Sequence, residues 1–384
     1  MKEIYLDNAA TTKTLEESAK LMLSIMTEEY GNPSSIHRKG FAAEKHIKKA
    51  REIVAGVLDC EPKEIIFTSG GTESDNLAII GAARANKRKN KHIVTSSIEH
   101  SAVSGAMKYL EEKEGFEITC VPCNENGTVN PESIKEAIHE DTILVSVMYV
   151  NNETGSLQPI KEIEKIIRFA GDNIIFHVDA TQAVGKYRIN LKNSRIDLLT
   201  GSSHKFHGPK GAGFLYRRDG IKLEPVIIGG GQESGFRSGT ENVAGIAGMA
   251  NSLLYMSDNL DESYNRVSDL KKDFINKISD IEEVYINGGG NGSPYIVNVS
   301  FAGIKGEVLV HALEDRSIYA STSSACSSRS SKPSPVLSSM GLSPERMDSA
   351  VRFSFSIDTK KEEIESAAEA LRELVPVLLR FKQV

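Results

Sequence analysis

The stretch IIFHVDATQ, residues 174–182, sets the pattern for the first half of the chain. A nearly continuous apolar run ends at a carboxylate, Asp179, and small and polar residues follow it. Such runs are typical of strands buried in a parallel sheet. Similar runs alternate with amphipathic stretches from about residue 63 to residue 216. This alternation predicts an α/β domain with a mostly parallel sheet.

Seven segments have strand character, and they predict a seven-stranded sheet. They are 65–67, 92–94, 118–120, 143–147, 174–178, 196–199 and 213–216. Helices are expected between them, for example over 102–112 and over 131–139, the second opened by a proline at a first-turn position. Ahead of the sheet, Thr14 and Glu17 have the spacing of a capping box, and apolar residues between 41 and 57 predict an amphipathic helix.

The pattern changes in the last third of the chain. With 384 residues, the chain exceeds the size at which one hydrophobic core keeps growing. A long helical stretch leads to about Ile278, and strand-like segments at 295–301 and 351–355 enclose a helix near 307–316. A final helix is expected from 360 to about 381. We therefore predict a large domain over 14–257 and a smaller α+β domain formed by residues 1–13 and 258–384.

Composition excludes several classes of protein. The 46 basic and 52 acidic residues are scattered and give a net charge of -6, so nucleic acid is not an expected partner. No apolar stretch resembles a signal peptide or a membrane span, so a cytoplasmic location is expected. Four cysteines are too few for a disulfide framework. Cys60 and the pair Cys120 and Cys123 are expected to be structural, and no metal site is expected.

Three segments carry candidate chemistry for pyridoxal 5'-phosphate (PLP). Lys205 lies among small residues, SSHKFHGPKG (202–211), which offers the rigid seat that a Schiff-base lysine needs. Asp179 ends a strand, where a carboxylate can keep the pyridine nitrogen protonated. FTSGGTES (67–74) supplies a strand, a glycine turn and a helix start, where backbone N–H groups favour a phosphate. Each segment alone has an ordinary structural explanation; together they predict a PLP site.

In their order along nearly the whole chain, these segments resemble the NifS/IscS cysteine desulfurases, which belong to the class V aminotransferases and to the fold type I PLP enzymes. The resemblance rests on further segments as well. They are YLDNAATT (5–12), YGNPS (30–34), EH (99–100), NNE (151–153), GGGQE (229–233), RSGT (237–240), SAC (324–326) and VRFS (351–354). So many motifs in the same order make chance agreement implausible.

The resemblance implies a role for each site residue. Lys205 is expected to form a covalent aldimine with PLP, Asp179 to pair with the pyridine nitrogen, and His100 to stack on the ring and pass protons. The remaining expected contacts are Gln182 to the ring hydroxyl, Gly71, Thr72, Ser202 and His204 around the phosphate, Asn152 near the cofactor and the substrate carboxylate, and Arg352 as a clamp on that carboxylate. The family also implies a homodimer in which Thr240 reaches the phosphate of the neighbouring active site.

Cys326 is the expected sulfur acceptor. It lies in a serine-rich stretch, 321–331, which is typical of a mobile loop, and the expected catalytic loop covers about 321–334. The resemblance implies that its thiolate takes sulfur from L-cysteine as a persulfide, leaves L-alanine, and passes the sulfur to an acceptor such as an iron-sulfur scaffold protein. The separation from Arg352 resembles the long-loop subgroup of the family.

Two alternatives remain open at this point. Another class V PLP enzyme, such as an aminotransferase or a selenocysteine lyase, would share most of these residues, and a transaminase would have no use for Cys326. A non-catalytic scaffold of the same fold would be expected to lack part of the cofactor set. The chain stops soon after the final helix, whereas housekeeping relatives are expected to carry a longer tail for docking a scaffold, so the acceptor stays open.

Overall fold

The computed structural model describes residues 3–87, 91–171, 173–288, 292–322 and 333–380. Its α-helices are α1 (Glu16–Thr27), α2 (Arg38–Leu58), α3 (Gly71–Asn86), α4 (Ser101–Glu114), α5 (Pro131–Ala137), α6 (Ile160–Ala170), α7 (Val243–Asp258), α8 (Leu260–Ile278), α9 (Gly306–Glu314), α10 (Pro335–Ser339), α11 (Pro344–Asp348) and α12 (Lys361–Arg380). Its strands are β1 (Ile4–Tyr5), β2 (Ile65–Thr68), β3 (His92–Ser96), β4 (Glu117–Val121), β5 (Thr142–Ser146), β6 (Ile175–Asp179), β7 (Leu198–Ser202), β8 (Gly213–Arg217), β9 (Val284–Asn287), β10 (Ile296–Phe301), β11 (Ile318–Tyr319), β12 (Ser321–Thr322) and β13 (Ala350–Ser354).

The largest sheet has seven strands in the order β2-β8-β7-β6-β5-β3-β4. Strands β4, β3, β5, β6 and β7 pair in parallel, whereas β8 is antiparallel to both of its neighbours, β7 and β2. All seven segments predicted as strands between residues 65 and 216 contribute to this sheet, so the prediction of a mostly parallel, seven-stranded α/β sheet is confirmed.

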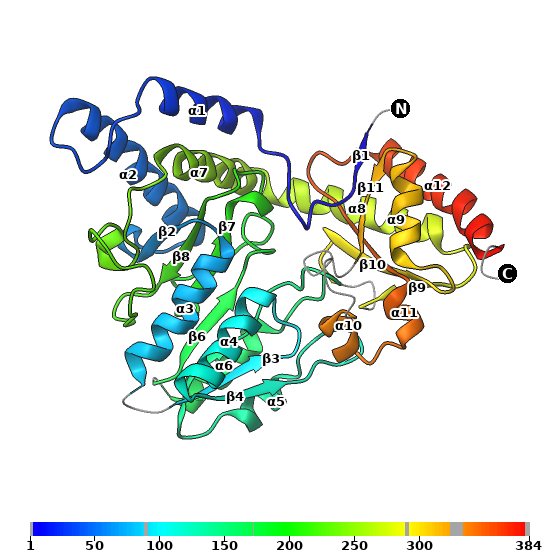
Figure 1. The fold of residues 1–384 in the computed structure, drawn as a ribbon, viewed down its shortest axis with the longest axis horizontal. Helices are drawn as coiled ribbons and strands as arrows, with labels where there is room; N and C mark the ends of the chain where they lie inside the picture. The colour runs from blue at the N-terminus through cyan, green and yellow to red at the C-terminus, as the bar shows by residue number, and fades with distance from the viewer. Residues whose placement is uncertain (1–2, 88–90, 172, 289–291, 323–332, 381–384) are drawn as a thin grey trace.

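Helices cover both faces of this sheet, because successive strand residues point to opposite sides. Ile66, Ile93 and Leu198 pack with α3 and α4 in one core cluster, and their neighbours Phe67 and Val94 pack with α2, α5, α6 and α7 in the other. Figure 1 shows this half of the molecule on the left. A sheet buried on both faces explains why its strands are continuous apolar runs.

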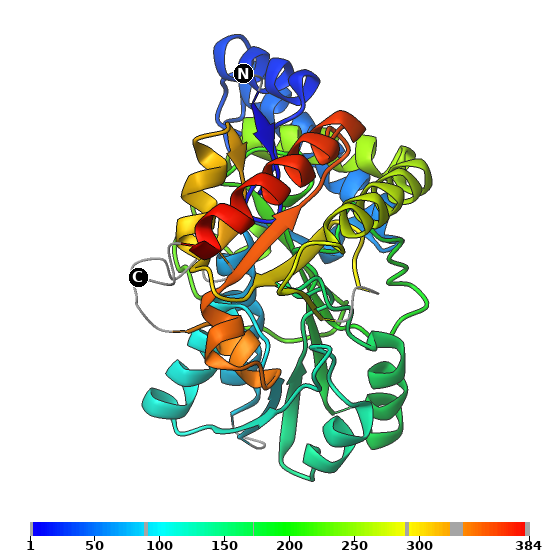
Figure 2. The same cartoon turned by 90° about the vertical axis from the view of Figure 1, so that its right-hand side faces the viewer.

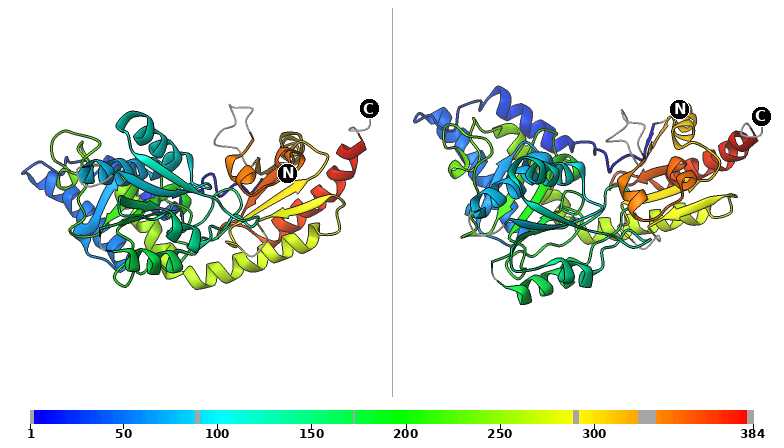
Figure 3. Two further views of the ribbon diagram at one scale, coloured as in Figure 1. Left: turned by 90° about the horizontal axis from the view of Figure 1, so that it is seen from below. Right: turned by 60° about the horizontal axis from the view of Figure 1, so that its bottom comes forward.

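A second sheet of four antiparallel strands, in the order β12-β13-β10-β9, has its own hydrophobic core. Helices α8, α9 and α12 pack on it, and Figure 3 shows α8 extending from the half with the large sheet to the half with the small one. The first strand, β1, pairs in parallel with β11 and lies beside this second sheet (Figure 2). The chain therefore starts in the C-terminal half of the structure.

Two details of the sequence analysis differ from the structure. The capping box is wrong: α1 begins after Leu15 with no side-chain cap, and the Thr14 hydroxyl donates instead to the carbonyl of Gly208 at 3.3 Å. The long helical stretch that ends at Ile278 is divided at Asn259 into α7 and α8. Among the described helices, none is long and apolar enough to cross a membrane.

Candidate active site

A cavity of about 240 Å³ lies where the large sheet faces the second sheet. It brings together nearly all of the predicted site residues from segments far apart in the sequence. Its walls are formed by Ala9, Ala10, Gly71, Thr72, Asp75, His100, Met148, Val150, Asn152, Asp179, Thr181, Gln182, Ser202, His204, Lys205 and Arg352. The carboxyl ends of parallel strands β6 and β7 supply Asp179 and Ser202, which is where open α/β sheets bind ligands.

Lys205 ends a single 3-10 turn, Ser203–Lys205, that directly follows β7. Its ammonium donates hydrogen bonds to the carbonyl oxygens of Ala9 at 2.7 Å and Ala10 at 2.8 Å. The N-terminal segment is held in place here because Thr12 also contacts the carbonyl of His204, through its own N–H and its hydroxyl. The Lys205 side chain thus joins two segments that are almost two hundred residues apart in the sequence.

Asp179 is buried at the end of β6, and its Oδ1 accepts a hydrogen bond from the N–H of Thr181 at 2.9 Å. A second buried carboxyl, that of Asp75 in α3, lines the same cavity. Burial and the nearby charge of Asp179 raise the pKa of Asp75 well above its usual range. Asp75 Oδ1 lies 3.6 Å from Nε2 of His177, whose pKa burial lowers to about 4. At neutral pH the imidazole of His177 is therefore neutral, and burial disfavours the charged form of Asp75.

The glycine turn before α3 forms a cradle suited to an anion. Gly71 is the first residue of α3, and a Cβ at this position would lie 3.0 Å from Oγ1 of Thr181. Among the described residues, Oγ1 of Thr181 and Nδ1 of His204 are buried with no hydrogen-bond partner. Burial and the neighbouring lysines lower the pKa of His204 to about 4. Unpaired polar atoms beside a helix N-terminus are the arrangement that binds phosphate.

Arg352 reaches the cavity from β13 and is almost completely buried. Its Nη2 donates to Oδ1 of Asp7 at 2.7 Å, and its Nη1 donates to the carbonyl of Asn152 at 3.0 Å. Its Nε is buried without a partner in the described structure. A guanidinium fixed in this way leaves hydrogen-bonding capacity for a small carboxylate.

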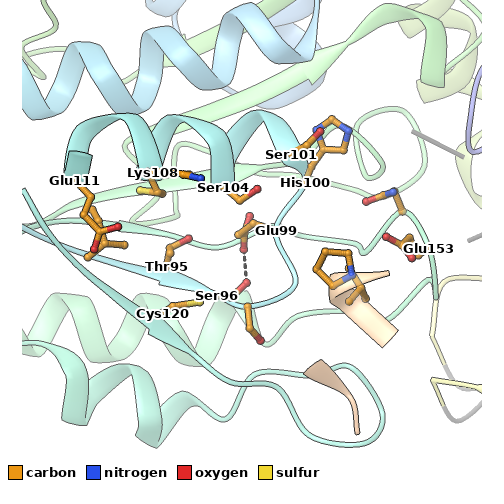
Figure 4. A pocket seen from close by; sticks show the side chains of 16 residues that line it. Thr95, Ser96, Glu99, His100, Ser101, Ser104, Lys108, Glu111, Cys120 and Glu153 are labelled. Atoms are coloured by element: carbon orange, nitrogen blue, oxygen red, sulfur yellow. Dashed lines mark hydrogen bonds between the residues drawn. The ribbon is translucent and has the colours of Figure 1, made fainter. Parts of the chain in front are cut away.

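A second cavity of about 440 Å³ adjoins the first one, and His100 and Asn152 line both. Figure 4 shows Glu99 hydrogen-bonded to Ser96 in this cavity, with His100 and Glu153 to one side of it. Burial raises the pKa of Glu99 to about 8 and that of Glu153 to about 7. The second cavity is therefore lined by two carboxyl groups whose pKa values lie close to neutral pH.

His100 caps the N-terminus of α4, and its Nδ1 accepts a hydrogen bond from the N–H of Ala102 at 3.2 Å. This bond leaves Nε2 as the nitrogen that carries the proton when the ring is neutral. The hydrogen bond to Ala102 therefore fixes the orientation of a ring that lines both cavities.

One predicted residue that the structure describes, Thr240, is not brought into the cavity. Thr240 is exposed and lies outside the lining of its own subunit's cavity. Cys326 lies outside the described residues. On its C-terminal side, Ser334 caps α10, and its hydroxyl donates to Oε2 of Glu153 at 2.6 Å.

The other three cysteines are free thiols, as expected. Burial raises the pKa of Cys60 to about 12, and it also raises the pKa of Cys120. Because the thiolate is the nucleophilic form, these two residues are poor nucleophiles at neutral pH.

Sequence reasoning missed several residues that the fold brings to the site. Asp75 lies four residues after Gly71, and its position as a second acidic residue near the start of the helix, after Glu73, was the available signal. The carbonyls of Ala9 and Ala10, which accept hydrogen bonds from Lys205, belong to the backbone, so the residue types do not indicate their role. Lys186, buried close to Gln182, resembles an ordinary surface lysine in the sequence.

Comparisons with known proteins agree with this geometry. Residues 4–366 match the family described as aminotransferase class-V. The chain is 45% identical over 378 residues to the cysteine desulfurase IscS of Clostridium botulinum, covering 97% of this chain and 94% of that protein. It is 44% identical to the IscS of Methanosarcina thermophila, covering 98% and 93%. A solved structure titled NifS-like protein superposes with a TM-score of 0.93 at 36% identity, covering 98% of this chain and 100% of that one. The chain therefore belongs to the class-V aminotransferase family and, within it, to the NifS/IscS-type cysteine desulfurases.

Proposed function

We propose that this chain converts L-cysteine to L-alanine and transfers the sulfur to its own Cys326 for delivery to an acceptor protein. The observation that carries this proposal is the single cavity that joins Lys205, Asp179, His100 and Arg352. A lysine, a buried carboxylate, an imidazole and a guanidinium are the groups that PLP chemistry on an amino acid requires.

The residues present fit PLP, on which class V aminotransferases depend. Lys205 would hold the cofactor covalently, and Asp179 would pair with its ring nitrogen. The unpaired Thr181 and His204 atoms described above support a phosphate position at the glycine turn. The other proposed contacts are those of Gly71, Thr72, Ser202, Asn152 and Gln182, all of which line the cavity. When bound, PLP supplies an electron sink for the charge that develops at the substrate α-carbon.

The chain's own residues would then act in sequence. Arg352 holds the substrate carboxylate through its forked N–H groups. Lys205, in its neutral form, accepts the proton from the α-carbon. The Cys326 thiolate attacks the substrate sulfur, so that an S–S bond forms while the bond between sulfur and the β-carbon breaks. His100 is the proposed proton donor to the carbon product, which leaves as alanine while the persulfide stays on Cys326.

We also propose a domain division, a dimer, an acceptor and a cellular location for this chain. The proposed large domain covers 14–257 and the proposed small domain is formed by residues 1–13 and 258–384; the separate core of the second sheet supports this division. The exposure of Thr240 is consistent with a homodimer in which this residue reaches the phosphate of the neighbouring subunit. An iron-sulfur scaffold is the proposed class of acceptor, and the cytoplasm is the proposed location.

One experiment tests the reaction. Purified protein reconstituted with PLP is incubated with L-cysteine, alanine is measured, and protein persulfide is labelled with a selective reagent and mapped by mass spectrometry. We expect alanine and persulfide in equal amounts during a first turnover without reductant, with the label on Cys326. Alanine formed without any protein persulfide would contradict the proposal, and so would a protein that binds no PLP.

A further inference from the structure

Lys186 is a buried lysine that the proposed reaction does not use. Its side chain lies at the inner end of the turn that follows β6, and only 5% of the residue is exposed. In the described part of the chain, no carboxylate lies within ion-pair distance of its ammonium. Its polar contact is with Oε1 of Gln182, four residues earlier, at 3.2 Å, and its ammonium lies 5.3 Å from the ring centre of Tyr295.

Burying a lysine at this position costs free energy of folding. A buried ammonium without a carboxylate partner loses hydration that one hydrogen bond and one aromatic ring replace only in part. Burial, together with the nearby Lys205, lowers the pKa of Lys186 to about 7. An apolar residue of similar length would fill the same space without this penalty.

The hydrogen bond of Lys186 decides which way the Gln182 amide faces. An amide can turn over with little change in shape, so only its partners fix its oxygen and its nitrogen. Nζ of Lys186 donates to Oε1, so Oε1 faces Lys186. Nε2 then donates to the carbonyl of Ala9 at 2.9 Å, the same carbonyl that accepts a hydrogen bond from Lys205 at 2.7 Å. The donor end of the amide therefore faces the cavity beside Lys205.

We propose that Lys186 is a positioning residue, which holds the Gln182 amide with its N–H group toward the ring hydroxyl oxygen of the cofactor. Without Lys186, the amide could turn its oxygen toward that site, where it would repel the ring oxygen instead of donating to it. This inference rests on the proposed binding of PLP and of Gln182 in the cavity.

The test is a double-mutant cycle with PLP binding as its readout. The apparent dissociation constant for PLP and the absorption spectrum of the bound cofactor are measured for wild type, Lys186→Met, Gln182→Ala and the double variant. We expect Lys186→Met to raise the dissociation constant by roughly tenfold and to shift the absorption maximum, because one oriented hydrogen bond is lost. In the Gln182→Ala background, the same substitution should change the constant less than twofold.

Lys271 provides a matched control. It is equally buried, its pKa is lowered to about 8 by burial, and it donates to the carbonyl of Ser293 at 2.9 Å, outside the residues that line the cavity. Lys271→Met should leave PLP binding unchanged, whatever it does to thermal stability. If Lys186→Met does not fold, Gln182→Glu tests the same point. It should gain an ion pair with Lys186 and thermal stability, and lose PLP affinity.

The outcomes separate this inference from the proposed function. Wild type that binds no PLP would refute both. Wild type that binds PLP, together with unchanged affinity in Lys186→Met, would refute the role of Lys186 alone. An equal loss of affinity in the Gln182→Ala background would also refute it, because Lys186 would then act independently of Gln182.

Discussion

Replacing Arg352 by alanine should separate substrate binding from cofactor binding. The guanidinium is buried, is fixed by Asp7 and by the carbonyl of Asn152, and has an Nε without a partner in the described structure. Two charge-assisted hydrogen bonds to a desolvated carboxylate are worth on the order of 2 to 4 kcal/mol, so KM for cysteine should rise by roughly 30- to 700-fold. PLP occupancy, measured by its visible absorption, should stay close to that of wild type.

Stability complicates this experiment, because the substitution also leaves Asp7 without its partner. Breaking a buried ion pair costs up to about 3 to 5 kcal/mol, and the Asp7 side chain, 20% exposed, recovers part of this through water. Arg346→Ala is a suitable control, since Arg346 donates to Asn287 within the small sheet and does not line the cavity. It should lower the melting temperature without changing KM.

Arg352→Lys refines the comparison, because lysine keeps the charge and loses the fork. We expect it to recover only part of the affinity for cysteine. If Arg352→Ala folds, holds PLP and shows the KM of wild type, the assignment of Arg352 to the substrate carboxylate is wrong.

Three further predictions follow, two from the proposed function and one from the burial of Glu99. Lys205→Ala should fold and lose the visible absorption of covalently held PLP. A normal spectrum with full turnover would show that another amine binds PLP covalently. Cys326→Ser should keep bound PLP and still react with cysteine spectroscopically, while alanine and protein persulfide fall to background; alanine at the wild-type rate would overturn the sulfur-transfer step. Burial raises the pKa of Glu99 from 4.5 to about 8, so the folded chain keeps a proton that the unfolded chain releases as pH rises through this window. The stability of wild type should therefore fall relative to Glu99→Gln between pH 4.5 and 8, by at most about 1.4 kcal/mol per pH unit in chemical denaturation, and a constant difference would contradict the raised pKa.

The sequence predicted the large sheet well because its strands are buried on both faces. A run such as that of β6 has one structural explanation, and the carboxylate at its end lies at the edge where ligands bind. Predicted residues that occupy strand ends and glycine turns, such as Asp179 and Gly71, therefore lie in the cavity.

What the sequence could not predict depends on contacts between distant segments. The spacing of Thr14 and Glu17 favours a local cap, but the carbonyl of Gly208, 194 residues away, takes the hydroxyl of Thr14. Asp7 pairs with Arg352 across 345 positions, and no local pattern marks either residue as the partner of the other. The role of Lys186 likewise depends on burial, which its residue type does not indicate.

The placement of the N-terminal segment has a consequence for biosynthesis. Residues 4–8 are made before the large sheet, but their backbone partners, Ser317, Tyr319 and Ser354, are made after it. The carbonyls that accept from Lys205, those of Ala9 and Ala10, directly follow this segment. The large sheet can form while translation continues, since its strands end at Arg217. The cavity, in contrast, can be completed only after Arg352 in β13 has been synthesised, so its assembly follows that of the large sheet.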